Sequence, residues 1–288
     1  YDHLIKFCIK DRSGNQLDPV SAVCCYSGTL YMLSKKKGSE RQLVICDSYI
    51  NRGNPVFLDI GNHHPVTLFG GCSNSAAICS EGEIIFISLN SVMNSPKAKI
   101  ESVSLPDEEK ASSVACCESS IVVLSSNNRV FSSRVSLNGK LEFSEVLELK
   151  GKEIVYISGV MEHILTVSKE GRVFGRGSNE SGQLGLGKET KKAPSFVEIS
   201  SLEGYDIKAA YAGVCHSLFE TRDGKILSCG FNGNGELLLS SGPGEPVYLP
   251  TETAITEGAT FCIVGNKLSI VFIDNGQPPN TPNMKIWH

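Results

Sequence analysis

The sequence predicts an all-β protein: a single β-propeller domain over residues 1–288, with six or seven four-stranded blades. Three observations predict it. The apolar residues stand in short β-branched and aromatic segments, and no stretch of ten or more shows the 3.6-residue period of a helix. A tight turn between two strands recurs six times, every 43 to 53 residues. Each recurrence supplies about four strands, which is typical of a propeller blade.

The recurring turns are recognised by the segments before them. Each turn follows a strand with apolar residues at alternate positions, and a small residue precedes that strand. The turns end at Gly38, Gly82, Asn128, Gly171, Gly224 and Gly276. The small residues include Gly213 and Gly265, which we predict to be structural glycines at points where a side chain would collide with a neighbouring strand.

A second strand follows each turn. The segments EIIFIS, RVFSSR, RVFGRG and KILSCG begin at Glu83, Arg129, Arg172 and Lys225. Because only a tight turn separates each of them from the strand before, we expect four β-hairpins. The longer connections contain Pro, Gly and Asn, which interrupt regular structure.

The two ends of the chain predict how the ring closes. The first unit contains LIKFCIK, VSAVCC and TLYMLS but lacks a leading strand, and the chain ends in the apolar segment MKIWH. If Met284–Trp287 pairs into the first blade, the ring closes with a strand from each end and leaves no open edge. This count gives six blades. Seven remains the alternative if the N-terminal segment and the tail form a further small blade.

Composition restricts the function classes. The 288 residues carry a net charge of -4, so we expect no nucleic-acid partner, since duplex binding favours a basic surface. The sequence has no run of about 18 apolar residues, so we expect no membrane span, and the N-terminus lacks the pattern of a secretory signal. Eleven cysteines, most of them beside Val, Ala or Ile and without a C-x-x-C motif, indicate buried thiols in a reducing compartment, cytoplasmic or nuclear.

The Gly-dense segment 178–187 is the most conspicuous candidate site. Phosphate-binding loops need a helix N-terminus or a P-loop lysine behind them, and no helix is expected here. Tight turning is therefore the favoured interpretation, with Gly177 and Gly182 as structural glycines. Asn179 and Asn232 occupy equivalent positions in two such loops, and we predict that both are turn formers.

Candidate histidines are few. His163 and His216 stand at nearly equivalent places, where packing between blades is favoured over contact with a partner. His63 and His64 precede Pro65 in an expected loop, and with no third ligand in view we predict no metal site. No residue pattern indicates catalysis or a cofactor.

The residues GRVFGRGSNESGQLGLG at 171–187, followed by AYAGVCHSLFETRDG at 210–224, resemble the repeat of the regulator of chromosome condensation family. The next unit repeats the pattern as GKILSCGFNGNGELLL, with Glu236 in place of Gln and Leu237-Leu238 in place of Leu-Gly. The convincing match covers residues 170–276. The resemblance implies a propeller, usually of seven blades, and either guanine-nucleotide exchange on a small GTPase or a role as an interaction module in larger proteins.

We therefore predict a non-enzymatic, monomeric protein-interaction module that binds a protein partner through loops on one propeller face. The expected contact residues are Arg176, Asn179, Glu180 and His216. The alternative, implied by the resemblance, is a guanine-nucleotide exchange factor for a Ran-like small GTPase. Exchange in the family uses a protruding β-wedge, and the sequence shows no obvious insertion of that kind.

Overall fold

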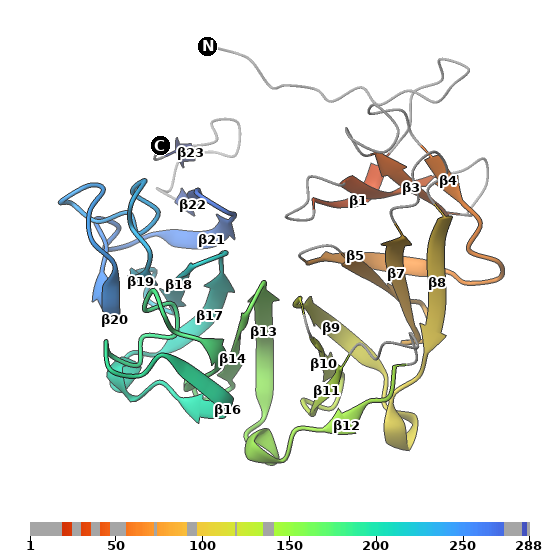
Figure 1. Cartoon of the computed structure of the whole chain (residues 1–288), viewed down its shortest axis with the longest axis horizontal. Helices are drawn as coiled ribbons and strands as arrows, with labels where there is room; N and C mark the ends of the chain where they lie inside the picture. The colour runs from red at the N-terminus through yellow and green to blue at the C-terminus, as the bar shows by residue number, and fades with distance from the viewer. Residues whose placement is uncertain are drawn as a thin grey trace, which may run out of the picture. The chain divides into compact units, whose positions relative to one another are not determined.

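The computed structural model describes residues 19–24, 30–35, 41–46, 56–71, 74–90, 97–118, 120–134, 141–273 and 284–286. These residues form strands β1 to β23 and three 3-10 segments of one turn each, and the chain divides into two compact units at 1–111 and 112–288 (Figure 1). The predicted all-β architecture with scarce helix is confirmed.

The first unit holds two four-stranded antiparallel sheets whose strands are paired in sequence order. One sheet is β1 (Pro19–Cys24), β2 (Leu30–Lys35), β3 (Arg41–Cys46) and β4 (Val56–Leu58); the other is β5 (Pro65–Gly70), β6 (Asn74–Cys79), β7 (Ile84–Asn90) and β8 (Lys97–Val103). The core of this unit lies between the two sheets, where Leu33 and Leu43 pack with Ala77 and Ile85.

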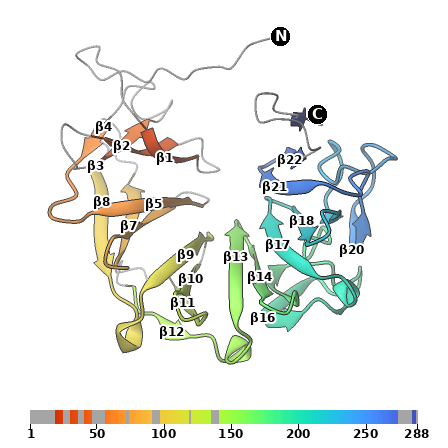
Figure 2. The same cartoon turned by 180° about the vertical axis from the view of Figure 1, so that it is seen from behind.

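The second unit continues the same pattern through four more sheets (Figure 2). The first three are β9 (Ala111–Cys116), β10 (Ser120–Ser125), β11 (Val130–Arg134) and β12 (Ser144–Glu145); β13 (Ile154–Val160), β14 (His163–Ser168), β15 (Val173–Ser178) and β16 (Lys192–Glu198); and β17 (Ile207–Ala212), β18 (His216–Thr221), β19 (Ile226–Gly230) and β20 (Val247–Glu252). The last holds β21 (Ala259–Val264), β22 (Ser269–Ile273) and β23 (Met284–Ile286).

The four expected hairpins are present. Strands β7, β11, β15 and β19 each pair antiparallel with the strand before, as in the register Val167↔Val173 to His163↔Gly177. Strands β14 and β18 are buried along their whole length. Because successive side chains point to opposite faces, such strands contribute to the packing on both sides of their sheet.

The core of the second unit lies between consecutive sheets. Leu165 of β14 and Phe219 of β18 belong to one apolar cluster that joins two neighbouring sheets, and both are fully buried. Corresponding clusters lie on either side, one around Val122 and Ile154 and one around Leu218 and Val271. The sheets therefore stack face to face in chain order, as propeller blades do.

The predicted pairing of the C-terminal tail is corrected. Met284–Ile286 pairs with β22 in the last sheet of the second unit, in the register Ile270↔Ile286 to Phe272↔Met284, and the first sheet has four strands without it. The tail strand therefore pairs with the strand that precedes it in sequence. The segment LIKFCIK lies outside the described residues.

Cysteines behave as the small apolar residues that the sequence predicts. Five of them, Cys79, Cys116, Cys117, Cys229 and Cys262, are buried. Among the helical segments that the structure describes, none is long and apolar enough to cross a membrane.

Candidate functional site

The connections between strands in the second unit lie at two opposite edges. Because strand direction alternates in an antiparallel sheet, the connection from the first to the second strand lies at the same end as that from the third to the fourth. In the sheet β13–β16 these are the turn at Met161 and Glu162 and the Gly-rich loop 179–191. We call this end the loop edge. It continues across neighbouring sheets, because Glu118 N donates to Met161 O at 2.9 Å.

A pocket of about 450 Å³ opens at the loop edge between the sheets β9–β12 and β13–β16. Its wall combines hydroxyl groups, charged side chains and apolar surface from both sheets. The polar and charged lining residues are Ser120, Ser132, Glu162, Arg176, Ser178 and Lys192. Two of these residues are basic and one is acidic, so the pocket carries a net positive charge.

Arg176 on β15 is the central side chain of this pocket, and we call the cavity the Arg176 pocket. Its guanidinium donates to Ser120 Oγ at 3.2 Å and to Ser132 Oγ at 3.4 Å, and so reaches from one sheet to the next. The guanidinium carbon lies 5.0 Å from the centre of the Phe196 ring. Stacking on an aromatic face and two hydroxyl contacts hold the guanidinium in place, although it is only half-buried.

Gly177 allows the strand that carries Arg176 to approach the adjacent turn. Its φ is +114°, and a Cβ there would overlap the carbonyl oxygen of Glu162. Ser178 N donates to the same oxygen at 2.9 Å. A side chain at position 177 would push β15 away from this turn and displace the neighbouring arginine.

The other predicted structural glycines differ in how closely they are packed. A Cβ at Gly182 would lie 2.6 Å from Val247 O, and one at Gly213 would overlap the His216 ring, so both positions require glycine. Among the described residues, a Cβ at Gly265 would meet Leu268 O at 3.8 Å, an ordinary contact, so its role as a structural glycine stays a prediction.

Asn179 and Glu180 are adjacent but face different surroundings. Asn179 is fully buried; its Nδ2 donates to Gly187 O at 3.0 Å and Thr190 O at 2.6 Å, and its Oδ1 accepts from Leu184 N at 2.8 Å. It is the turn former that the sequence predicts, and its side chain is not available to a partner. Glu180 is exposed beside it on the loop edge.

His216 is also buried, with 1% of its surface exposed, so it offers no surface to a partner. Its Nε2 lies 2.9 Å from Ser269 Oγ in the next sheet. His163 repeats this contact, with Nε2 3.0 Å from Ser217 Oγ. Burial lowers the pKa of His216 to about 4 and, with the neighbouring His216 charge, that of His163 to about 3. Both are neutral at pH 7, and the predicted packing role is confirmed.

The structure thus brings Arg176 and Glu180 to one accessible edge and removes Asn179 and His216 from it. It adds Ser120, Ser132 and Phe196, which sequence reasoning did not identify. The two serines come from a sheet in which the repeat motif is faint. Only the packing of the sheet β13–β16 against the sheet β9–β12 reveals that they meet the arginine.

A family model for the regulator of chromosome condensation (RCC1) repeat matches residues 170–219, the segment that builds one wall of the pocket. A probable E3 ubiquitin-protein ligase HERC6 of Homo sapiens is 31% identical over 173 residues, which cover 57% of this chain and 16% of that protein. A secretion-regulating guanine nucleotide exchange factor of Bos taurus is 38% identical over 87 residues, 30% of this chain and 18% of that protein. Residues 170–219 of this chain therefore carry an RCC1-like repeat.

Solved structures support the same fold. Human WBSCR16 superposes with a TM-score of 0.73 at 13% identity, over 91% of this chain and 75% of that one. Yeast RCC1 (Prp20), solved with Kap60 bound, superposes with a TM-score of 0.66 at 17% identity, over 91% of this chain and 68% of that one. This RCC1-like chain spans at most 16% of the length of the first three curated relatives it matches, so those proteins contain much that it does not match.

Proposed function

We propose that this RCC1-like chain is a non-enzymatic protein-interaction module that binds an acidic side chain of a partner protein in the Arg176 pocket. The observation that carries the proposal is a guanidinium fixed by Phe196, Ser120 and Ser132 in the wall of a cavity of about 450 Å³. A planar guanidinium matches a carboxylate in two parallel hydrogen bonds. Glu180, exposed on the same edge, would contact a basic residue of that partner.

Binding suits this edge because buried polar groups within the sheets already hold the fold together. His163 and His216 join consecutive sheets. Glu220 is fully buried; its Oε1 lies 2.5 Å from Lys208 Nζ and its Oε2 accepts from the Tyr211 hydroxyl at 2.7 Å. Groups committed to such contacts provide a rigid support for the loops, which is how scaffolds present binding residues.

The test is quantitative affinity capture with the intact chain and matched variants. Arg176→Ala and Glu180→Lys should each lose a shared set of partners. Glu203→Lys, on the opposite edge of the same sheets, should keep that set. Loss of the set in all three variants, or in none of them, would contradict a site on the loop edge.

The alternative function is nucleotide exchange on a Ran-like small GTPase. Its support is the similarity to a secretion-regulating guanine nucleotide exchange factor over 87 residues. Against it, the loop 179–191 packs on the neighbouring sheet, where Gly187 N donates to Tyr248 O at 3.0 Å, and so does not protrude as a wedge would. Release of labelled GDP from a panel of purified small GTPases, including Ran, separates the two functions. Acceleration well above the spontaneous rate would replace the interaction module with an exchange factor.

The domain organisation is part of the proposal. We infer one monomeric propeller domain over residues 1–288, of six or seven blades, cytoplasmic or nuclear. The six-fold repetition in sequence supports it, and so does the recurrence of antiparallel sheets of three or four strands through the described residues. Limited proteolysis tests this: a stable fragment that ends near Ala111 would indicate two separate domains.

A further inference from the structure

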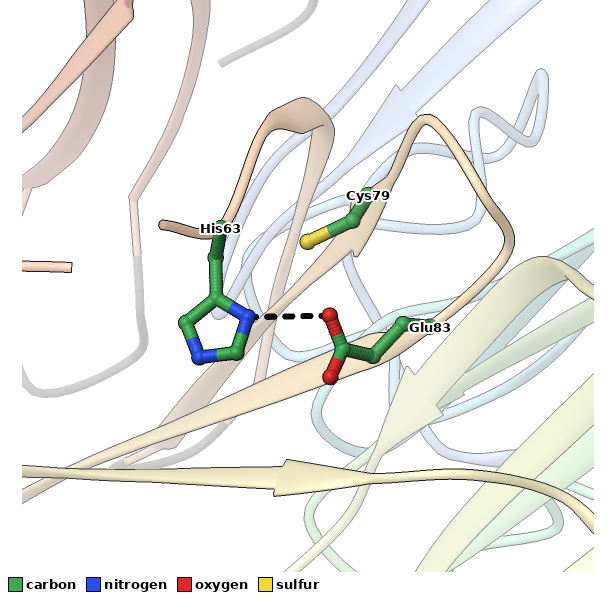
Figure 3. Close-up of side chains that lie close together, drawn as sticks. All are labelled: His63, Cys79 and Glu83. Atoms are coloured by element: carbon green, nitrogen blue, oxygen red, sulfur yellow. Dashed lines mark hydrogen bonds and ion pairs between the residues drawn. The ribbon is translucent and has the colours of Figure 1, made fainter. Parts of the chain in front are cut away.

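One cluster of metal-binding side chains lies in the first unit, away from the Arg176 pocket. His63, Cys79 and Glu83 each offer one ligand atom, and these atoms all lie within 4.8 Å of one another (Figure 3). His63 Nδ1 and Glu83 Oε2 are 2.9 Å apart. The Cys79 sulfur points toward the gap between them.

The backbone holds the three residues in this arrangement. Cys79 and Glu83 flank the β6–β7 turn, where Cys79 N donates to Glu83 O at 2.8 Å, so both side chains leave the same end of one hairpin. His63 lies in the turn before β5, and Ser80 N donates to His64 O at 3.0 Å, which ties that turn to the hairpin. The fold therefore brings the three ligand atoms together.

A hydrogen bond from a residue outside the ligand set orients the Glu83 carboxylate. Ser102 Oγ donates to Glu83 Oε1, which leaves Oε2 directed at His63. Partners of this kind fix the geometry of ligands in metal sites. Cys79 is buried, whereas the His63 and Glu83 side chains are each 31% exposed, so a cation and a water ligand could reach the site from solvent.

A Cys–His–Glu catalytic arrangement does not fit the same residues. It would need the carboxylate on one ring nitrogen of the histidine and the thiol on the other. Here Nδ1 faces Glu83, and the sulfur lies on the side of that same nitrogen, with Nε2 directed away (Figure 3). Three donor atoms that converge on one point are the geometry of a coordination site.

We propose that His63, Cys79 and Glu83 bind a divalent transition-metal cation, with Zn²⁺ as the ion that best matches their donors. One nitrogen, one sulfur and one oxygen are the ligand types of tetrahedral zinc, which often takes three protein ligands and a water. The His63 Nδ1 and Glu83 Oε2 atoms are 2.9 Å apart, whereas two such ligands of a tetrahedral zinc ion lie about 3.3 Å apart, so the ion would replace this hydrogen bond and separate the two atoms slightly. The prediction of no metal site rests on the absence of a C-x-x-C motif and of a third ligand near His63 and His64, and Cys79 and Glu83 are too distant in sequence to be recognised as ligands.

Metal titration of the full chain tests the proposal. After chelation and dialysis, Zn²⁺ is titrated in competition with a chromophoric chelator, and Co²⁺ serves as the spectroscopic probe. We expect one tight equivalent per chain, a thiolate-to-cobalt charge-transfer band and d–d bands of tetrahedral intensity. Cys79→Ser should abolish the charge-transfer band. His63→Ala should weaken Zn²⁺ binding at least about 100-fold, since loss of a residue that only orients a ligand already lowers metal affinity about 10–100-fold.

Two controls separate the site from adventitious binding. His64→Ala removes the adjacent exposed histidine, and Cys262→Ser removes another buried thiol; both should keep the cobalt spectrum and the zinc affinity. His63→Ala keeps the test valid if Cys79→Ser fails to fold, because His63 is partly exposed, and circular dichroism checks both variants. No tight equivalent in the intact chain, or equal weakening by His63→Ala and His64→Ala, would overturn the proposal.

Discussion

The two Gly-rich loops of the second unit, residues 179–191 and 231–246, share a central hydrogen bond but have different neighbours. Asn179 Oδ1 accepts from Leu184 N at 2.8 Å, and Asn232 Oδ1 accepts from Leu237 N at 3.2 Å. Gly177 and Gly230 precede them with φ of +114° and +113°. The two loops thus share the asparagine turn and the glycine conformation before it.

The two loops differ in the residue that precedes the glycine. Arg176 precedes Gly177, whereas the buried thiol of Cys229 precedes Gly230 and lies 3.7 Å from Gln183 O. A loop of this type therefore forms equally well with a small apolar residue in place of arginine. Arg176 is thus not part of the repeated loop scaffold, and we propose that it binds a partner.

A second difference concerns backbone strain. Gly185 of the first loop has φ of +66°, and Leu238 occupies the equivalent position of the second with φ of +56°. A leucine in this conformation costs about 1–2 kcal/mol. Burial of its side chain, in the cluster with Ile255 and Cys262, offsets that cost.

The largest expected effect comes from Gly177→Ala. The new Cβ would overlap Glu162 O at a φ of +114°, so we expect about 4 kcal/mol of lost stability, measured by chemical denaturation. Gly187→Ala serves as the control, because nothing lies within 4 Å of a Cβ there and only its φ of +84° opposes the change. Equal losses for the two variants would contradict the close approach to the Glu162 turn.

The asparagines sharpen the comparison. Asn179→Ala removes three hydrogen bonds inside the first loop, and Asn232→Ala removes two in the second. Buried groups left unsatisfied cost about 1–3 kcal/mol, so we expect losses of about 3 and about 2 kcal/mol. The order of the two midpoints in urea is the measurement, and the reverse order would show that the second loop depends more on its asparagine.

The paired histidines predict acid sensitivity. The pKa of His216 is lowered to about 4 by burial, below its unfolded value near 6.5, so protons bind the unfolded chain more strongly. Stability is retained above pH 6.5 and falls as the pH drops toward 4, by about 2 kcal/mol for this histidine at pH 5. His216→Gln should flatten that slope; His64→Ala, which removes an exposed imidazole, should leave it. An unchanged slope in His216→Gln would contradict its burial as a neutral group.

The tail gives a smaller effect. Deletion of residues 283–288 removes β23 from the edge of β22, and we expect the thermal midpoint to fall by about 2–4 °C. The control is a shorter deletion that removes only residues 287 and 288 and so keeps β23. If both shortened chains melt like the intact one, the pairing of β23 contributes no stability.

Much of this fold could be predicted from local sequence, and the site could not. The hairpins follow from alternating apolar residues around tight turns, and Asn179 follows from the preference of asparagine for turns. The partners of Arg176 come from another sheet, 44 and 56 residues away, and no local pattern marks them. Met284–Ile286 was assigned to the wrong sheet because its apolar pattern predicts a strand without identifying its neighbour.

Partner capture by the Arg176→Ala variant, measured together with its free energy of unfolding, tests the central claim most directly. The control is Arg222→Ala, which removes a half-exposed arginine from the opposite edge, where its Nε lies 3.0 Å from Asp206 Oδ1. We predict that both variants unfold within about 1 kcal/mol of the intact chain, since exposed arginine contacts contribute little. Arg176→Ala alone should reduce capture of the loop-edge partners at least about tenfold, the loss expected for one charge-assisted contact. Full capture by Arg176→Ala, or an equal loss in Arg222→Ala, would contradict the account.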